Sequence, residues 1–206
     1  MSTKTDRRKV LAVLAGGLVL GIGAAVTLAA WNDSEFATGT FTAGSFNLQG
    51  SVTSATAGYV DHNVDRGDAA ATLAFSLPAA TALSPGDVVY APLWVRLDGT
   101  TSNNATLVPD TITAGTGGNE ANLSYTIRAI APDAVCDASA AGTVIASGPT
   151  LSALTGATAV PLAKGAAIGT PGTAVQLCFA VTAAATITQG ATGSATWEFT
   201  ATSTPN

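Results

Sequence analysis

The chain has 206 residues, of which 47% are hydrophobic and only 10% are charged. Thirteen acidic residues outnumber eight basic ones, so the formal net charge is −5 at pH 7. Nucleic acid is therefore a poor candidate partner, because binding to phosphates needs clustered Lys and Arg. The length suits one domain with a hydrophobic core of its own.

The first thirty residues have the pattern of a secretory signal. Four basic residues open this segment: Lys4, Arg7, Arg8 and Lys9. An uncharged, mainly apolar run then extends over 10–30 and ends in small residues. This order is typical of a signal peptide, whose basic flank stays in the cytoplasm while the rest is exported. We therefore predict that residues 1–29 are a signal peptide and that the mature chain is secreted to the extracellular space or cell surface.

Cleavage is predicted between Ala29 and Ala30, because a signal peptidase needs small side chains beside the bond that it cuts. An uncleaved anchor stays open as an alternative, since about 20 apolar residues are enough to span a bilayer. Such an uncleaved signal would be the only expected membrane contact. The pair Arg7–Arg8 also has a faint likeness to a twin-arginine signal. Cleavage would remove four of the eight basic residues and one of the thirteen acidic ones, which leaves a net charge of −8.

Residues 30–49 are predicted to form an N-terminal arm that is rich in aromatic residues. Its large apolar residues are Trp31, Phe36, Phe41, Phe46 and Leu48. The aromatic residues are five positions apart, which defines no single face of a helix or strand. Two ways of burying them stay open. The arm either forms the first strand of the chain's own sandwich or inserts into a neighbouring subunit, where main-chain hydrogen bonds would give affinity.

The segment 61–68 combines three acidic residues with His62, the chain's single histidine. Three of its residues match the first three ligand positions of a calcium-binding loop. The sixth and twelfth positions, however, hold Arg66 and Thr72 instead of Gly and Glu. We expect a polar surface loop here, with calcium binding as the alternative. Because the chain also lacks His-Glu-x-x-His and Gly-x-Ser-x-Gly motifs, no catalytic, cofactor-binding or metal site is expected.

Alternating apolar and polar residues recur along the rest of the chain, and helical periodicity does not. Five segments show this alternation and are predicted to be strands: 71–77, 88–97, 123–130, 174–182 and 194–202. Pro85 and Gly86 predict a tight turn, and Pro92 indicates an edge strand or a bulge. Residues 147–173 predict a long loop with short strands. Short strands separated by turns predict an all-β, antiparallel sandwich domain over 50–206.

The two cysteines, Cys136 and Cys178, both lie in the part that is predicted to be exported. Disulfides persist outside the cytoplasm, so we favour a bond between them over two buried free thiols. The bond would close a loop of about 43 residues and contribute about 4 kcal/mol through chain entropy. A metal site is disfavoured, because no second pair of ligands stands at a suitable spacing.

Several segments resemble the TasA/camelysin family of exported proteins. Two of them adjoin the predicted cleavage site: 27–33 (TLAAWND) and 40–48 (TFTAGSFNL). Further along, 83–87 (LSPGD) and 197–202 (WEFTAT) resemble the family's Pro-Gly-Asp turn and its final strand. The two cysteines depart from TasA itself and are similar to those of exported relatives in high-GC Gram-positive bacteria.

This resemblance implies a jelly-roll sandwich and processing by a signal peptidase of the SipW type. It also implies assembly into extracellular fibres, in which the N-terminal arm of one subunit completes the sheet of the next. The residues of the polymerisation arm would then be Trp31, Phe36, Phe41, Phe46 and Leu48. Camelysin is described as a metalloprotease, but this chain has no recognisable set of metal ligands, so that activity is not carried over.

The leading hypothesis is a non-catalytic, exported structural protein that self-associates by strand addition into fibres of a biofilm matrix or cell surface. A secreted metalloprotease of camelysin type and a monomeric surface binding module stay open as alternatives. No cofactor is expected. The expected partners are the SipW-type signal peptidase and further copies of the chain.

Overall fold

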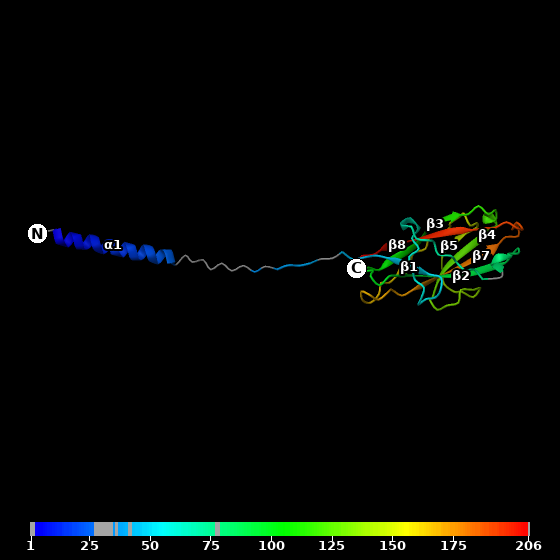
Figure 1. The fold of residues 1–206 in the computed structure, drawn as a ribbon, viewed down its shortest axis with the longest axis horizontal. Coiled ribbons are helices and arrows are strands. Elements are labelled where there is room, and N and C mark those ends of the chain that lie inside the picture. The colour runs from blue at the N-terminus through cyan, green and yellow to red at the C-terminus, as the bar shows by residue number, and fades with distance from the viewer. Residues whose placement is uncertain (1–2, 27–34, 36, 41–42, 77–78, 206) are drawn as a thin grey trace. The chain divides into compact units, whose positions relative to one another are not determined.

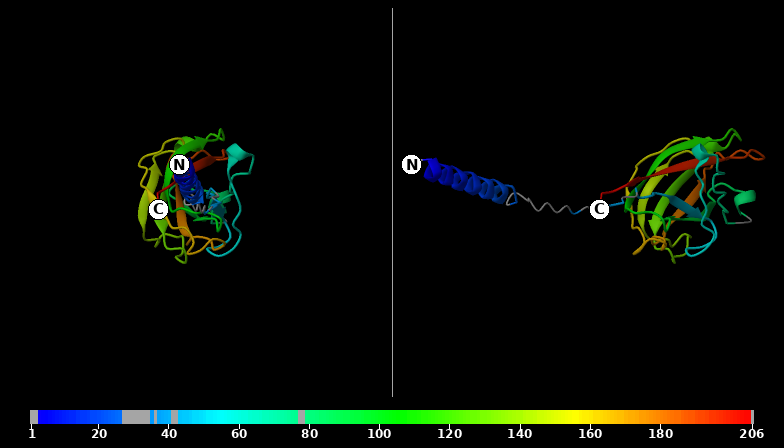
Figure 2. Two further views of the ribbon diagram at one scale, coloured as in Figure 1. Left: turned by 90° about the vertical axis from the view of Figure 1, so that its left-hand side faces the viewer. Right: turned by 60° about the vertical axis from the view of Figure 1, so that its left-hand side comes forward.

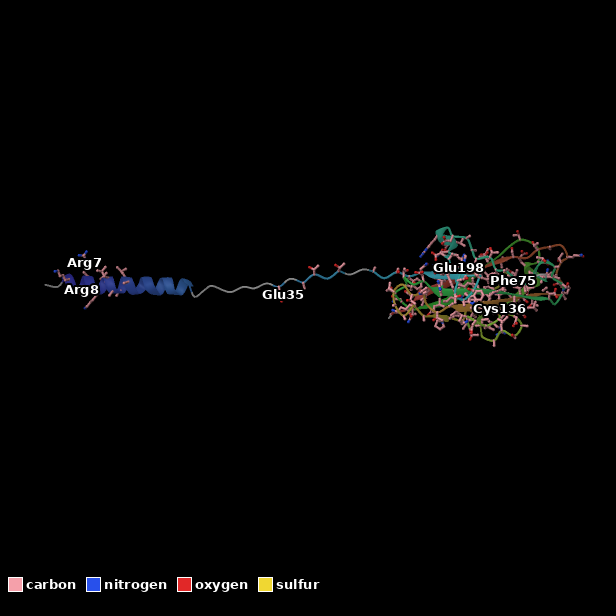
Figure 3. All side chains as sticks on the ribbon, turned by 60° about the horizontal axis from the view of Figure 1, so that its bottom comes forward. Arg7, Arg8, Glu35, Phe75, Cys136 and Glu198 are labelled. Atoms are coloured by element: carbon pink, nitrogen blue, oxygen red, sulfur yellow. A yellow bond between two sulfur atoms is a disulfide. The ribbon has the colours of Figure 1, made fainter. Side chains whose placement is uncertain are left out.

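The computed structural model of the protein describes residues 3–26, 35, 37–40, 43–76 and 79–205. The chain divides into two compact units, Met1–Thr42 and Ala43–Asn206. The first unit contains helix α1 (Thr3–Val26), which carries the basic residues Arg7 and Arg8 (Figure 3). Within the described residues, no helix is both long and apolar enough to cross a membrane. The predicted cleavage site, Ala29–Ala30, lies outside the described residues.

The second unit, which we call the body, is a sandwich of two antiparallel sheets (Figure 1). The larger sheet has the order β1-β2-β7-β4-β5, and the smaller has the order β6-β3-β8. The strands of the body are β1 (Leu48–Ser51), β2 (Val88–Leu97), β3 (Ala105–Ala114), β4 (Leu123–Ile130), β5 (Thr143–Gly148), β6 (Val160–Leu162), β7 (Val175–Ala183) and β8 (Ala195–Ser203). Three short 3-10 turns lie between them: η1 (Val64–Arg66), η2 (Ala79–Thr81) and η3 (Glu120–Asn122). The predicted all-β, antiparallel class is confirmed.

Alternation of side chains builds the core, as the sequence predicts for four of the strands. β2 and β4 have the predicted bounds, and β7 and β8 are shifted by one residue. Along β2, every second residue from Val89 to Leu97 is buried. These side chains pack against Leu177 and Phe179 of β7, which are at most 1% exposed. Strands with one buried face need this period of two, because successive side chains point to opposite faces.

Pro92 lies in the half of β2 that β1 does not cover. β1 pairs only with Trp94–Leu97, so β2 is an edge strand around Pro92 and an inner strand beyond it. The Tyr90 N–H points to the uncovered edge, where it donates to Ser76 Oγ at 3.2 Å. Pro92 is two positions further and faces the same edge, so its missing N–H interrupts no pairing. The predicted edge position is therefore correct for this half of the strand.

The predicted turn before β2 is confirmed. Gly86 has φ +88°, the left-handed region that glycine adopts without strain. The Asp87 N–H donates to the Ser84 carbonyl at 3.0 Å, and the Asp87 carboxylate accepts from the Ser84 N–H at 2.7 Å. Residues 83–87 thus redirect the chain into β2.

Strand β3 was not predicted, and its pairing explains why. Its register with β8 shifts between Pro109 and Ile112, so inward residues have odd numbers before the bulge and even numbers after it. A bulge inserts an extra residue and breaks the period of two, and a proline lowers the expectation of a strand. For these two reasons, the alternation of side chains does not identify β3 as a strand. Residues 147–173 form loops with the short strand β6, as predicted.

The prediction of a strand over 71–77 is wrong for the described residues of that segment. Ala71, Leu73 and Phe75 are half-buried and alternate with exposed neighbours, yet residues 71–76 form no strand. Leu77 lies outside the described residues. The side-chain pattern is that of a strand, but among the described residues no main-chain hydrogen bond involves residues 71–75, and only Ser76 bonds to β2. This difference matters for the site described below.

The predicted disulfide is confirmed. Cys136 and Cys178 are bonded, with their Cα atoms 5.3 Å apart. Cys178 belongs to β7, and Cys136 (labelled in Figure 3) belongs to the loop between β4 and β5. The Trp94 indole donates to the Pro132 carbonyl of the same loop at 2.7 Å. The loop is thereby fixed over the outer face of the larger sheet, where it buries Gln176 to 1% exposure.

Candidate functional site

A groove of about 1040 Å³ opens along β8, between the two sheets. Inward side chains of β2 and β7, such as Leu93 and Phe179, form its floor, and β8 forms one wall. Residues 69–76, which we call the strap, form the opposite wall. Both walls can be followed in Figure 2, where β8 is red and the strap is blue-green. Phe75 of the strap and Glu198 of β8 are labelled in Figure 3.

The β8 wall presents large apolar side chains that the body buries only in part. Trp197 and Phe199 point inward, as predicted, but both are half-buried. Their rings pack edge to face on Phe179, with centroid distances of 5.2 and 6.1 Å. Trp197 also packs against Tyr125 at 5.5 Å, and burial raises the pKa of the Tyr125 hydroxyl. These rings therefore have one face on the core and another open to the groove.

Within the described part of the chain, the outer edge of β8 has no partner strand. β8 is the last strand of the smaller sheet and pairs only with β3. Among the described residues, no main-chain hydrogen bond joins Ala195–Ser203 to any segment other than β3. The unpaired N–H and C=O groups of such an edge are a template for pairing with another chain.

Two buried or anchored side chains fix the start of β8. The Asn119 side chain, 2% exposed, donates to the carbonyls of Thr188 and Ala191, both at 2.9 Å. The Glu120 carboxylate accepts from the N–H groups of Gly117 and Gly118 at 2.7 and 2.8 Å, and from the Ser194 N–H, just before β8, at 3.4 Å. These hydrogen bonds, that of Gly117 foremost, hold the pKa of Glu120 below its ordinary value of 4.5. The connection from β7 to β8 is therefore tied to the loop that precedes β4.

The strap is anchored at its two ends. At one end the Ser76 N–H donates to the Tyr90 carbonyl of β2 at 2.9 Å. At the other, the His62 ring Nδ1 lies 3.0 Å from the Ala69 carbonyl. Between these anchors Leu73 and Phe75 pack against the hydrophobic core. The strap thus covers the inner face of β2 through its side chains.

The acidic segment 61–68 lies at the rim of the groove. It is exposed apart from His62, and Asn63 caps the turn η1 through a 3.2 Å hydrogen bond from the Arg66 N–H. Asp61 accepts from the Asn47 amide at 2.9 Å. In the part of the chain that the structure describes, no group of three His, Cys, Asp or Glu side chains is placed to hold a metal ion.

The predicted arm residues fall on both sides of the boundary of the body. Trp31, Phe36 and Phe41 lie outside the described residues. Phe46 and Leu48 belong to the body, where they are half-buried and pack against the core. The intervening chain is tied down, because the Asn47 N–H donates to the Thr101 hydroxyl at 3.0 Å.

No protein-family model matches this chain, and no curated protein matches it. The groove and its two walls were not predicted from the sequence, although two of their elements were. The alternation in 71–77 and the aromatic pair in 194–202 marked both walls. Their placement opposite each other depends on the tertiary fold.

Proposed function

We propose that the chain is an exported, non-catalytic structural protein that self-associates by strand addition and forms extracellular matrix or surface fibres. The observation that carries this proposal is the groove beside the unpaired edge of β8. An extended segment from a second copy would pair with β8 and cover the open faces of Trp197 and Phe199. Main-chain pairing and burial of alternate side chains are the two sources of affinity in this mode of recognition.

The segment Phe36–Ala43 is the proposed occupant of the groove. Its eight residues carry no charge, and Phe36 and Phe41 are its large apolar residues. β8 has nine residues, and at about 3.3 Å per residue the two segments have similar lengths. The described residues Ala37–Thr40 are exposed, and the segment up to Thr42 belongs to a different compact unit from the body. A segment with these properties is suited to pairing outside its own body.

Export is supported by the signal pattern of residues 1–29 and by the Cys136–Cys178 bond. A disulfide in a protein of ordinary size is typical of compartments outside the cytoplasm. We further propose cleavage before Ala30 by a signal peptidase of the SipW type, and a jelly-roll arrangement like that of the TasA/camelysin family. These finer points rest on the sequence resemblance.

A monomeric binding module is the second candidate. Ligand pockets have volumes of about 300–1,000 Å³, so the groove is large enough to hold a ligand. A metalloprotease is not proposed, since no motif of the chain supports it. The two remaining functions differ in one property. A fibre subunit needs its arm for assembly, whereas a binding module keeps its ligand affinity without the arm.

Electron microscopy of the chain that begins at Ala30 tests the proposal. We expect filaments for the parent chain and monomers for Phe41→Asp, because a buried unpaired charge costs several kcal/mol. The matched control is Thr40→Asp, which adds the same charge on the opposite face of the arm strand and should leave filaments intact. Parent chains that stay monomeric, or Phe41→Asp chains that form filaments as readily, would contradict the proposal.

A further inference from the structure

The strap has the side chains of a strand without the main-chain pairing of one. Ala71, Leu73 and Phe75 point inward and are half-buried, and Thr72 and Ala74 are exposed. Among the described residues, no main-chain hydrogen bond involves any residue of 70–75. The chain therefore carries a strand pattern for which its own fold supplies no partner.

The anchor at Ser76 indicates which way the strap's backbone faces. Ser76 donates its N–H to Tyr90 of β2. In an extended segment the N–H groups of successive residues point to opposite edges. The N–H groups of Leu73 and Phe75 therefore face away from β2, toward the groove, whereas that of Ala74 faces the same edge as Ser76.

As far as the described residues show, the groove is thus bounded by unpaired backbone on both sides. On one side is the outer edge of β8, and on the other is the outward edge of the strap. A segment that paired only with β8 would leave the strap's polar groups without protein partners. A segment seated between the two would pair along both of its edges.

We infer that the groove holds one strand position with pairing on both sides. The segment 36–43 of a second copy pairs with β8 along one edge and with the strap along the other. The strap then becomes a strand, and the smaller sheet extends to the order β6-β3-β8-arm-strap. This inference rests on the proposed function and adds that the strap is part of the docking surface. Part of the binding free energy is consumed in ordering the strap.

Amide hydrogen exchange, measured by NMR on residues 43–206 with and without a peptide of residues 30–43, tests the inference. This fragment contains every described strand, the disulfide and the core. We expect the amides of Leu73 and Phe75 to exchange rapidly in the free body and about tenfold or more slowly with peptide bound. The Ser76 amide, already hydrogen-bonded to Tyr90, is the internal reference. The same amides in filaments of the chain from Ala30 give a second readout.

A pair of proline variants provides a matched test. Ala71→Pro removes an N–H from the edge that faces the groove, and Ala70→Pro removes one from the opposite edge. Neither N–H has a main-chain partner in the described structure, so the free body should keep its stability in both. Ala71→Pro should bind the peptide about fivefold more weakly than the parent, because one hydrogen bond is lost. Ala70→Pro should bind it about as tightly as the parent.

The outcomes separate this inference from the proposed function. Peptide binding that leaves the Leu73 and Phe75 amides unprotected, or that Ala71→Pro and Ala70→Pro affect equally, would overturn the inference and leave strand addition at β8 in place. If the peptide does not bind and the chain from Ala30 stays monomeric, the inference and the proposed function both fail.

Discussion

The two sides of this sandwich treat their sheet edges differently. The edge of β5 is covered by its own chain, because Ser147 and Thr155 exchange two main-chain hydrogen bonds of 3.0 and 2.7 Å. Ile145 of β5 is 1% exposed, and the Tyr125 hydroxyl donates to the Ala153 carbonyl of the covering segment at 2.9 Å. We call this the closed side. On the open side, no described segment covers the edge of β8, and Trp197 is only half-buried.

This contrast shows that the chain can cover an edge and does so elsewhere. β1 is also covered, since Gly50 and Val60 exchange two main-chain hydrogen bonds of 3.0 Å. Natural sheet proteins cover or shorten their edges to prevent pairing with other chains. The uncovered nine-residue edge of β8, beside half-buried aromatic rings, is therefore the place where pairing with another chain is expected. Stability should depend on the closed side, and association on the open side.

The largest expected effect concerns the disulfide, which lies on the outer face, away from the groove. Replacing both cysteines with serine (Cys136→Ser, Cys178→Ser) should lower the free energy of unfolding by about 4 kcal/mol, because the unfolded chain gains entropy. Chemical denaturation measures this loss, and adding a reductant to the double variant is the control. Filament formation below the unfolding temperature should persist. If the folded double variant formed no filaments, the claim that stability and association depend on different sides of the body would be wrong.

A pair of core variants compares the two sides directly. Ile145→Ala in β5, on the closed side, should cost about 3 kcal/mol, because a fully buried isoleucine leaves a cavity. Leu73→Ala in the strap should cost about 1 kcal/mol, because this side chain is only partly buried. Denaturant titration of both variants gives the difference. Equal losses would show that the open side is as well packed as the closed side.

The smallest expected effect is a pH dependence at the start of β8. Because the folded pKa of Glu120 lies below 4.5, its ionisation stabilises the fold above that pH, and this contribution disappears as the pH falls through the folded pKa. Glu120→Gln should therefore be less stable than the parent at pH 7, with the difference shrinking below pH 4.5. Thermal unfolding between pH 7 and pH 3 measures it. Glu198→Gln, which also removes one negative charge but makes no bond to Gly117, is the control. If this variant lost as much stability relative to the parent between pH 3 and pH 7 as Glu120→Gln, the hydrogen bonds of Glu120 would not be the cause of the pH dependence.

The sequence predicted the regular strands well, because their causes are local. β2 and β4 follow from alternation alone, and their bounds were predicted to the residue. β3 was missed because its bulge between Pro109 and Ile112 breaks the alternation that identifies strands. Over 71–76 the alternation is present but the predicted strand is not, since a strand also needs main-chain pairing, which alternation of side chains does not reveal.

The candidate site could be predicted only in its parts. Trp197 and Leu73 were placed on inward faces from their spacing, but they are more than a hundred positions apart. No local pattern indicates that a groove separates the two segments. The same is true of Asn119, whose hydrogen-bond partner Thr188 is 69 positions away. Such long-range placement comes from the tertiary fold.

The central claim is that the open edge of β8 receives the arm of another copy. A cryo-electron microscopy structure of filaments formed by the chain that begins at Ala30 tests it most directly. The account predicts a strand built from residues 36–43 of one copy beside β8 of the next, with the rings of Trp197 and Phe199 covered. Filaments in which β8 stays unpaired, or pairs with β8 of another copy, would contradict it.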